Sequence, residues 1–317
     1  QAVTMGLRQE LKRDRNVIVM GEDVGLNGGV FRATDGLQKE FGPDRVIDTP
    51  LAELGIVGTA IGMAVNGMKP VAEIQFSGFL YGAFDQLLSH AARIRSRSRG
   101  RYSCPLVVRA PYGTGIRALE LHCESGESIF SHVAGLKMVV PSNPYDTKGL
   151  LAAAIRDPDP VIFYEPMRIY RAIKQDIPED DYIVPLGKAN IIQQGDDVTL
   201  IAWGAMLKTC QEAIAKLQGK YSVELIDLRT INPYDAETVI SSVKKTGRCV
   251  IAHEAPRTSG FAAELIAAIN EKSLLSLHAP VVRVTGPDTP IPFAKLEGYY
   301  LPDANRIIKG IEKVMSF

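Results

Sequence analysis

Short apolar runs alternate with longer, helix-like stretches along the first half of the chain. The runs are rich in Val and Ile, and we expect them to form buried strands at 15–23, 70–76, 105–111, 136–142 and 160–166. Apolar or small residues at helical spacing predict helices between them, at 52–66, 79–97, 125–134 and 144–156. This alternation predicts a mostly parallel sheet with helices on both faces.

The alternation stops in a polar, proline-containing stretch at 171–190, which has no helical stripe. It then resumes, with strands expected at 196–204, 221–229, 247–256 and 279–288. Helices are expected at 205–218, 235–246, 259–271 and 303–315. We therefore predict two α/β domains, at 1–175 and 191–317, joined by a linker at 176–190.

Composition excludes several classes of function. The 36 basic residues balance the 36 acidic ones, so no overall field favours nucleic acid or an anionic membrane as a partner. No apolar run approaches the roughly 18 residues of a membrane span. The four cysteines fall singly, without metal-type spacing, which is typical of a reducing compartment. These features predict a soluble intracellular protein.

Two local stretches could suggest nucleotide or nucleic-acid binding, but neither has the features that such binding requires. The stretch APYGTG (110–115) lacks the Gly-Lys-Ser/Thr end of a P-loop, and no GxGxxG follows the first predicted strand. Five arginines occupy alternate positions within 92–102, but no aromatic residues are interleaved with them. We interpret this run as a solvated or subunit-contact surface.

A lone acid, Glu53, begins a helix-like stretch made largely of Gly, Ala and small apolar residues. Gly55, Gly58 and Gly62 recur there at helical spacing, although Gly inside a helix costs about 1 kcal/mol relative to Ala. Two interpretations stay open. The stretch forms a tight helix–helix seam with a first-turn acid favoured by the helix dipole, or it lies against a flat ligand.

Three further side chains are candidates for chemistry near predicted strand ends, where open α/β sheets bind their ligands. Phe76 and Phe79 could stack on a planar heterocycle, although a Phe at a strand end is more often a core residue. His122 could hold or move a proton near neutral pH, or be only a hydrogen-bonded loop residue. A thiol nucleophile at the adjacent Cys123 is disfavoured, because neighbouring residues rarely point at each other.

The chain as a whole resembles a known family. The stretches GEDVG, RVIDTPLAELGIVGTAIGMAVNGMKPVAEIQF, ALELHCES, PVIFYEP and IAHEAP are similar, in this order and spacing, to the β subunit of the E1 component of 2-oxo acid dehydrogenase complexes. The resemblance implies a thiamine-pyrimidine-binding, transketolase-like domain followed by a transketolase C-terminal-like domain. It also implies thiamine diphosphate bound between an α and a β subunit.

The resemblance assigns roles to five side chains of this sequence. Glu53 matches the acid that hydrogen-bonds a ring nitrogen of the pyrimidine and so helps to activate the cofactor. Phe79 matches the aromatic residue that packs on the pyrimidine, and Phe76 is a second candidate. His122 matches the histidine facing the reactive carbon. Glu22 matches an acid in the cavity between paired active sites, and we expect it to relay protons.

Metal sites follow from the same resemblance. The diphosphate motif of the α chain, GDG followed by Asn-Asn, does not occur here, so the ligands of Mg²⁺ are expected on the α subunit. The stretch 152–160 resembles a loop that holds a monovalent cation, such as K⁺, mainly through backbone carbonyls. The candidate ligands are Leu106, Ala154, Asp157 and Asp159, and a plain acidic turn is the alternative.

The function that the resemblance implies is oxidative decarboxylation of a 2-oxo acid, with acyl transfer to the lipoyl group of E2. The expected partners are an E1 α subunit in an α2β2 heterotetramer and the lipoyl and subunit-binding domains of E2. His253 and Glu254 are placed among subunit and partner contacts. The expected location is the cytoplasm of a prokaryote or the mitochondrial matrix of a eukaryote.

The sequence also bears on the substrate and on competing functions. VIFYEPMRIYRA, DVTLIAWG and VIAHEAP favour a branched-chain 2-oxo acid over pyruvate, and pyruvate is the alternative. A self-contained transketolase-like enzyme is disfavoured because the diphosphate motif is missing. A non-catalytic scaffold of the same fold is disfavoured because Glu53, Phe79 and His122 are all present.

Overall fold

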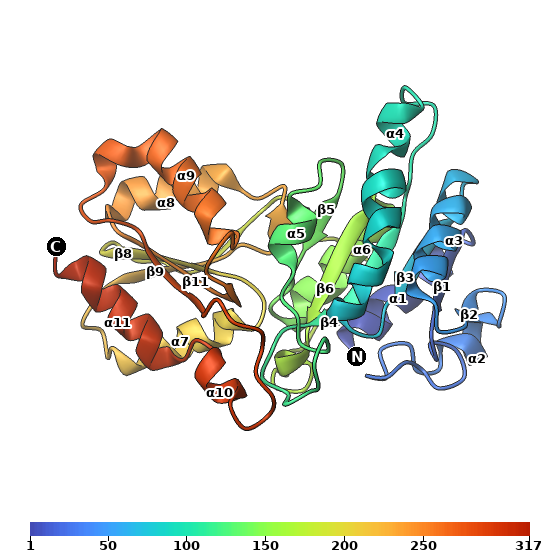
Figure 1. Cartoon of the computed structure of the whole chain (residues 1–317), viewed down its shortest axis with the longest axis horizontal. Helices are drawn as coiled ribbons and strands as arrows, with labels where there is room; N and C mark the ends of the chain where they lie inside the picture. The colour runs from blue at the N-terminus through green and yellow to red at the C-terminus, as the bar shows by residue number, and fades with distance from the viewer.

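A seven-stranded sheet and a five-stranded sheet form the centres of two α/β units that lie side by side (Figure 1). The computed structural model describes residues 1–317. Both sheets are mainly parallel and carry helices on both faces. The predicted fold class is therefore confirmed.

The first sheet has the strand order β10-β5-β6-β4-β3-β1-β2, and only β10 is antiparallel to its neighbour. The strands are β1 (Val17–Gly21), β2 (Val46–Asp48), β3 (Lys69–Glu73), β4 (Val107–Tyr112), β5 (Lys137–Val139), β6 (Val161–Pro166) and β10 (Thr230–Asn232). Every residue of β1, β4 and β6 is buried, as continuous Val- and Ile-rich runs covered on both faces should be. The three-residue strands β2 and β10 were not predicted.

Helices cover the first sheet on both faces. They are α1 (Ala2–Arg13), α2 (Leu37–Phe41), α3 (Glu53–Val65), α4 (Ile94–Arg97), α5 (Glu127–Ser131), α6 (Pro144–Arg156) and the short η1 (Ser77–Ala83), η2 (Gln86–His90), η3 (Ala91–Arg93) and η4 (Met167–Ile169). The single helix predicted at 79–97 is instead a succession of 3₁₀, π and α turns, from η1 to α4. A Cβ at Gly78 would lie 2.1 Å from the carbonyl oxygen of Leu121, so η1 is pressed against another loop.

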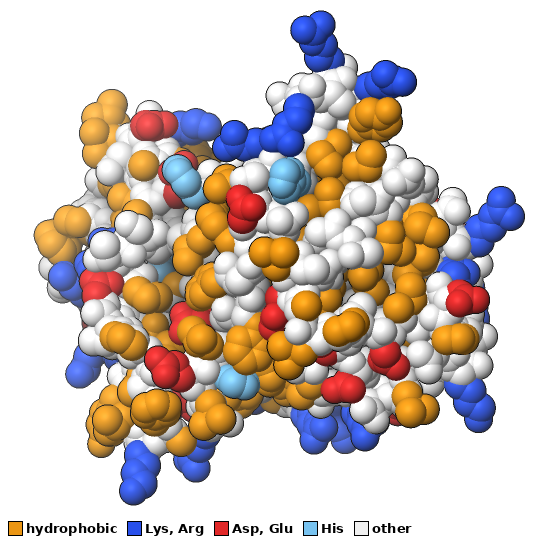
Figure 2. Space-filling view, turned by 45° about the vertical axis from the view of Figure 1, so that its right-hand side comes forward, with side chains coloured by type: hydrophobic (Ala, Val, Ile, Leu, Met, Phe, Trp, Pro, Cys, Tyr) orange, Lys and Arg blue, Asp and Glu red, His pale blue; other side chains and the backbone are white.

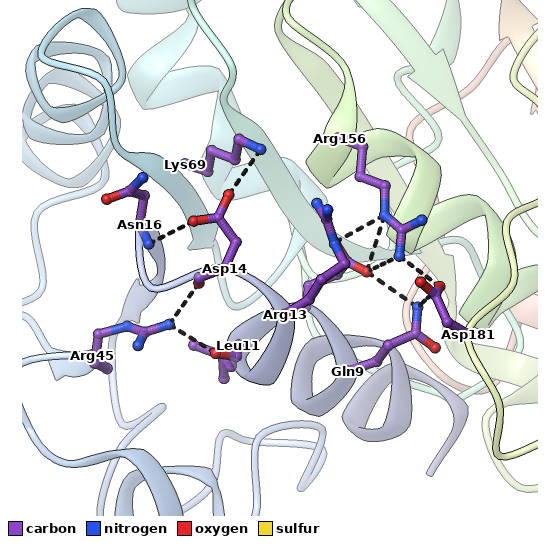
Figure 3. Close-up of polar contacts among 10 residues, drawn as sticks. Gln9, Leu11, Arg13, Asp14, Asn16, Arg45, Lys69, Arg156 and Asp181 are labelled. Carbon is purple, nitrogen blue, oxygen red and sulfur yellow. Dashed lines mark hydrogen bonds and ion pairs between the residues drawn. The ribbon is translucent and has the colours of Figure 1, made fainter.

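The amino-terminal helix α1 was missed in the sequence, although Val3, Leu7 and Leu11 lie at helical spacing and are buried. Its buried Glu10 pairs with Arg156 of α6, with 2.6 Å between Oε1 and Nη2. Arg156 also reaches Asp181, again at 2.6 Å (Figure 3). One guanidinium thus ties together α1, α6 and the segment that connects the two units.

That connecting segment has no helix or strand between η4 and β7 (Asn190–Gln193). It is fastened to α6 by the buried ammonium group of Lys148, which donates hydrogen bonds to the carbonyls of Pro178, Glu179 and Asp180 at 2.5, 3.1 and 2.9 Å. A buried ammonium needs such partners, because it leaves water on folding. The segment between the two units is therefore packed against the first unit and is not a free linker.

The second sheet has the order β12-β11-β8-β9-β7, with β7 antiparallel to β9. The strands after β7 are β8 (Val198–Ala202), β9 (Val223–Asp227), β11 (Cys249–Pro256) and β12 (Val282–Gly286). Its helices are α7 (Met206–Lys216), α8 (Ala236–Thr246), α9 (Ala262–Ser273), η5 (Leu274–Ser276), α10 (Glu297–Tyr300) and α11 (Ala304–Met315). All four strands and all four helices predicted for this half form.

The two units share a packed junction. Strand β10 comes from the second half of the chain but pairs with β5 of the first sheet. Next to it, Arg229 pairs with the buried Asp146 at 2.6 Å, and the indole N–H of Trp203 donates to Glu127 at 3.1 Å. One apolar core cluster of 38 residues extends from the first sheet into the second. None of the helices combines the length and apolar character that a membrane crossing requires.

Candidate active site

The side chains predicted to carry chemistry lie at the carboxyl-terminal edge of the first sheet. Glu22 directly follows β1, Phe76 follows β3, and His122 lies in the loop after β4. Glu53 is the first residue of α3, which packs against η1 with its Phe79. The topology thus gathers these five residues at one edge, where ligands of parallel sheets bind.

The rings of Phe76, Phe79 and His122 form a mutual cluster. Ring centroids are 4.3 Å apart for Phe76 and His122, 4.9 Å for Phe79 and His122, and 5.8 Å for the two phenyl rings. Nδ1 of His122 is 2.8 Å from the carbonyl oxygen of Glu120. A carbonyl only accepts, so Nδ1 carries a proton and Nε2 is left to exchange one.

The two acids at this edge interact. Glu22 is buried, and this burial raises the pKa of its carboxyl, with repulsion from Glu53 and Asp23 adding to the effect. Glu53 is half-buried and has no ion pair or hydrogen bond from its side chain within the chain. Its carboxylate is therefore available to a ligand.

The glycines of α3 do not form a helix–helix seam within this chain. A Cβ at Gly62 would meet nothing within 4 Å, and one at Gly58 would meet only the side chain of Gln86. Gly55 and Gly62 lie on the exposed side of the helix. The face of α3 that carries Gly55 and Gly62 is consequently accessible to a ligand or to another subunit.

Exposed apolar side chains surround this edge of the sheet. They lie in the loops after β1 and β4 and at the start of α3, and they are Leu26, Val30, Leu51, Leu54, Leu119 and Leu121. More broadly, Figure 2 shows apolar side chains spread over the middle of one face, while Lys and Arg gather toward its outline. Apolar clusters of this kind mark interaction sites in proteins.

A buried charge network that the sequence did not reveal lies in the neighbouring strands. Arg109 of β4 is fully buried, with Nη1 2.7 Å from Glu73 and Nε 2.5 Å from Glu165. These two carboxylates raise the pKa of the guanidinium against the effect of burial, which would lower it. The hydroxyl of Tyr170 donates to Glu165. In the sequence, the only sign of this network is an arginine inside an otherwise apolar predicted strand.

Aromatic packing connects this network to the catalytic candidates. The ring of Tyr170 stacks on that of Phe31 at 5.0 Å, and Phe31 meets Phe76 edge-on at 5.7 Å. Phe76 in turn contacts His122. The buried charge network is thus connected to the ring cluster through Tyr170 and Phe31.

The four residues predicted to hold a monovalent cation each have a partner within the chain. The carbonyl of Leu106 accepts from the N–H of Val161 at 2.9 Å, and that of Ala154 from Asp157 at 3.2 Å. The ammonium of Lys137 lies 2.7 and 2.6 Å from the two carboxylate oxygens of Asp157. Arg95 binds Asp159 at 2.6 Å. Binding of a cation here remains a prediction.

Two other expectations concern surfaces. His253 and Glu254 were expected among partner contacts, but both are buried, because β11 is an inner strand of the second sheet. The His253 ring stacks on Trp203 at 5.3 Å. The arginines of 92–102 are exposed, as predicted, and basic side chains are visible at the tip of the projecting helical stretch that ends with α4 (Figures 1 and 2).

Comparison with known proteins first defines the class. Residues 1–172 match the family described as the transketolase pyrimidine binding domain, and residues 187–307 match the transketolase C-terminal domain. Among solved structures, a protein described as "Split gene transketolase, inactive beta4 tetramer" superposes with a TM-score of 0.79 over 99% of this chain and 97% of that one. At 20% identity, this likeness concerns the fold.

Full-length relatives narrow the class. The pyruvate dehydrogenase E1 component subunit beta of Acholeplasma laidlawii is 50% identical over 99% of this chain and 96% of its own length. The protein of the same name from Bacillus subtilis is 50% identical over 100% of this chain and 98% of its own length. The chain belongs to the family of E1 β subunits of 2-oxo acid dehydrogenase complexes, which is associated with thiamine diphosphate. Within the chain, no group of three or more His, Cys, Asp or Glu side chains is arranged to hold a metal ion.

Proposed function

We propose that this chain is the β subunit of a pyruvate dehydrogenase E1 component. The relatives described above carry that name. So does a protein from Staphylococcus aureus that is 47% identical over 100% of this chain and 98% of its own length. These names favour pyruvate, the alternative, over the branched-chain substrate expected from the sequence. A pocket that differs by one or two methylene groups discriminates by only about 1–3 kcal/mol, so branched-chain substrates could still be turned over slowly.

The observation that carries the proposal is the unpaired carboxylate of Glu53, set on the same sheet edge as the ring cluster of Phe76, Phe79 and His122. These residues fit the aminopyrimidine ring of thiamine diphosphate, because the acid can bind a ring nitrogen and the phenyl rings offer an apolar face. When bound, thiamine diphosphate supplies the nucleophilic carbon and the electron sink for decarboxylation.

In this proposal each side chain has a separate task. Glu53 holds the pyrimidine ring nitrogen and shares a proton with it. Phe79 and Phe76 orient the ring and exclude water from it. His122, with Nδ1 fixed by the carbonyl of Glu120, uses Nε2 to exchange a proton with the substrate or to orient it. Glu22, whose pKa is raised by burial, passes protons toward the site.

The same proposal assigns the remaining parts of the site to partners. The Mg²⁺ ion and the diphosphate are held by an E1 α subunit, in an α2β2 assembly. The exposed leucines around the site and the open face of α3 offer the apolar area that such a subunit would cover. The lipoyl domain of E2 then reaches the site to accept the acyl group, and the subunit-binding domain of E2 docks on the assembled E1.

The experiment co-expresses this chain with its α partner and supplies thiamine diphosphate and Mg²⁺. Decarboxylation is followed with pyruvate and with 2-oxoisovalerate, at matched concentrations. We expect activity from the pair and none from this chain alone, with a higher kcat/KM for pyruvate. A pair that binds the cofactor but decarboxylates neither acid would instead favour the non-catalytic scaffold.

A further inference from the structure

The loop that carries His122 runs from the end of β4 to the start of α5 and has an unusual backbone. Gly113 and Gly115 have φ of +88° and +100°, and the non-glycine residues Arg117 and Leu121 have φ of 57° and 65°. Positive φ is costly for residues with a Cβ, and it persists only when surrounding contacts impose it. Something outside the loop must therefore hold its shape.

One such holder is Glu297, in the short helix α10 of the second unit. Its carboxylate accepts two backbone hydrogen bonds from the loop, one at each oxygen: the N–H of Gly115 at 2.8 Å and the N–H of Arg117 at 2.9 Å. The side chain of Glu297 is buried. A buried ionised carboxylate needs partners of this kind, and hydrogen bonds to a charged acceptor are stronger than neutral ones.

A second holder is Glu254, at the end of β11. One of its oxygens, Oε2, accepts both the backbone N–H and the hydroxyl of Thr114, at 2.9 and 2.8 Å. Its other oxygen lies so near Gly113 that a Cβ there would be 3.0 Å away. Glu254 is also buried, so this contact is shielded from water. Two acids of the second unit thus bind three residues near the start of the loop, Thr114, Gly115 and Arg117.

The far end of the loop is held by the first unit. The hydroxyl of Ser77 donates to the carbonyl of Glu124 at 2.7 Å, and the N–H of Gly113 donates to the same oxygen at 3.3 Å. His122 lies between the two fixed ends, against Phe76. A change at the first end should therefore move the imidazole without removing any of its own contacts.

We propose that Glu254 and Glu297 are positioning residues for His122, through which the second domain sets the geometry of a site built on the first. This inference rests on the proposed function for its catalytic consequence. Neither acid touches His122, and both act through the backbone of residues 114–117. The role explains why two acids of the second unit are buried against a loop of the first, about 140 and 180 positions away in sequence.

The decisive variant is Glu297→Gln, which keeps the side-chain shape but turns one acceptor oxygen into an NH₂ group that faces a backbone N–H. Glu254→Gln should be milder, because a single amide oxygen can take the place of Oε2 for both Thr114 donors. Glu212→Gln, on the exposed surface of α7 and without an ion pair, is the matched control.

The first measurement is hydrogen exchange by mass spectrometry on the full chain alone, so its outcome does not depend on whether the assembled enzyme decarboxylates anything. Glu297→Gln should speed exchange in peptides covering 113–124, with the rest of the chain at the rate seen in Glu212→Gln. Unchanged exchange at 113–124, or an even rise along the whole chain, would overturn the inference.

The second measurement uses the complex with the α subunit. Glu297→Gln should lower kcat by about 10- to 100-fold with pyruvate KM and cofactor affinity within twofold of wild type, as expected for a misplaced catalytic group. Glu254→Gln should lower kcat less. A rise in KM alone, or an equal loss in the Glu212→Gln control, would contradict a positioning role. An inactive wild-type complex would instead contradict the proposed function and leave the exchange result standing.

Discussion

The imidazole of His122 and the phenyl ring of Phe76 lie 4.3 Å apart, centroid to centroid, in a tilted arrangement. Phe79 is slightly farther from the imidazole, at 4.9 Å. In the sequence Phe76 is only the second aromatic candidate after Phe79, whereas in the structure its ring contacts both His122 and Phe31. Phe76 should therefore govern the orientation of the imidazole.

This relationship predicts the effect of Phe76→Leu. The variant keeps an apolar side chain but removes the ring nearest to the imidazole. In NMR spectra the His122 side-chain protons should therefore lose the part of their ring-current shift that Phe76 contributes and keep the part from Phe79. Phe84→Leu is the control, because Phe84 packs on Phe130 and not on the imidazole. If the His122 resonances respond equally to both substitutions, the ring contact is not what orients His122.

The buried network predicts a large stability effect for Arg109→Met. Loss of the guanidinium leaves Glu73 and Glu165 buried beside each other without a counter-ion, which should cost about 3–5 kcal/mol of unfolding free energy. Arg95→Met removes a solvent-exposed pair with Asp159 and should cost less than about 1 kcal/mol. Urea unfolding of the two variants measures the difference, and equal losses would contradict the account.

The domain junction predicts a dependence on pH. Burial raises the pKa of Glu127 to about 7, above its ordinary value of 4.5. Since the folded chain holds this proton more tightly than the unfolded chain, the associated stability is complete below about pH 4.5 and is lost as the pH rises through 7.

The variant Glu127→Gln keeps an oxygen for the indole N–H of Trp203 and cannot ionise. Its melting temperature should therefore fall less than that of wild type between pH 5.5 and pH 8. Glu212→Gln should reproduce the wild-type profile. A profile for Glu127→Gln that parallels wild type would show that Glu127 is ionised in the folded chain throughout this range.

The environment of Asp157 predicts the response to monovalent cations. If Lys137 keeps this carboxylate and Arg95 keeps Asp159, the melting temperature should be the same in KCl and in choline chloride at equal ionic strength. A rise that is specific to K⁺ would establish the cation site predicted from the sequence.

Elements with a local signal were predicted well. Helix α6 begins at Pro144 behind an Asn143 cap, and its predicted bounds, 144–156, are those observed. Strand β10 lacked such a signal, because three residues form a strand only when β5 of the other unit offers its edge. At the start of the broken helix, η1 likewise lies against a distant segment, because a Cβ at Gly78 would meet Leu121 of the His122 loop.

In the candidate site, too, some residues have a local sequence signal and others depend on distant contacts. Glu53, Phe79 and His122 could be proposed from the sequence because they stand in recognisable motifs, and the fold places them on one edge of the sheet. Arg109 and Glu297 stand in no motif that signalled a role. Their partners lie up to 182 positions away, so their contribution became visible only with the folded chain.

The central claim is that Glu53 is the proton-sharing acid of a site shared with an α subunit, and Glu53→Gln in the co-expressed, cofactor-loaded complex tests it most directly. The measurement is the rate at which the thiazolium C2 proton exchanges with deuterium, beside the rate of pyruvate decarboxylation and the affinity for the cofactor. The account predicts that both rates collapse by at least about 100-fold while thiamine diphosphate still binds. Exchange and decarboxylation at wild-type rates would show that Glu53 is only a first-turn acid of α3.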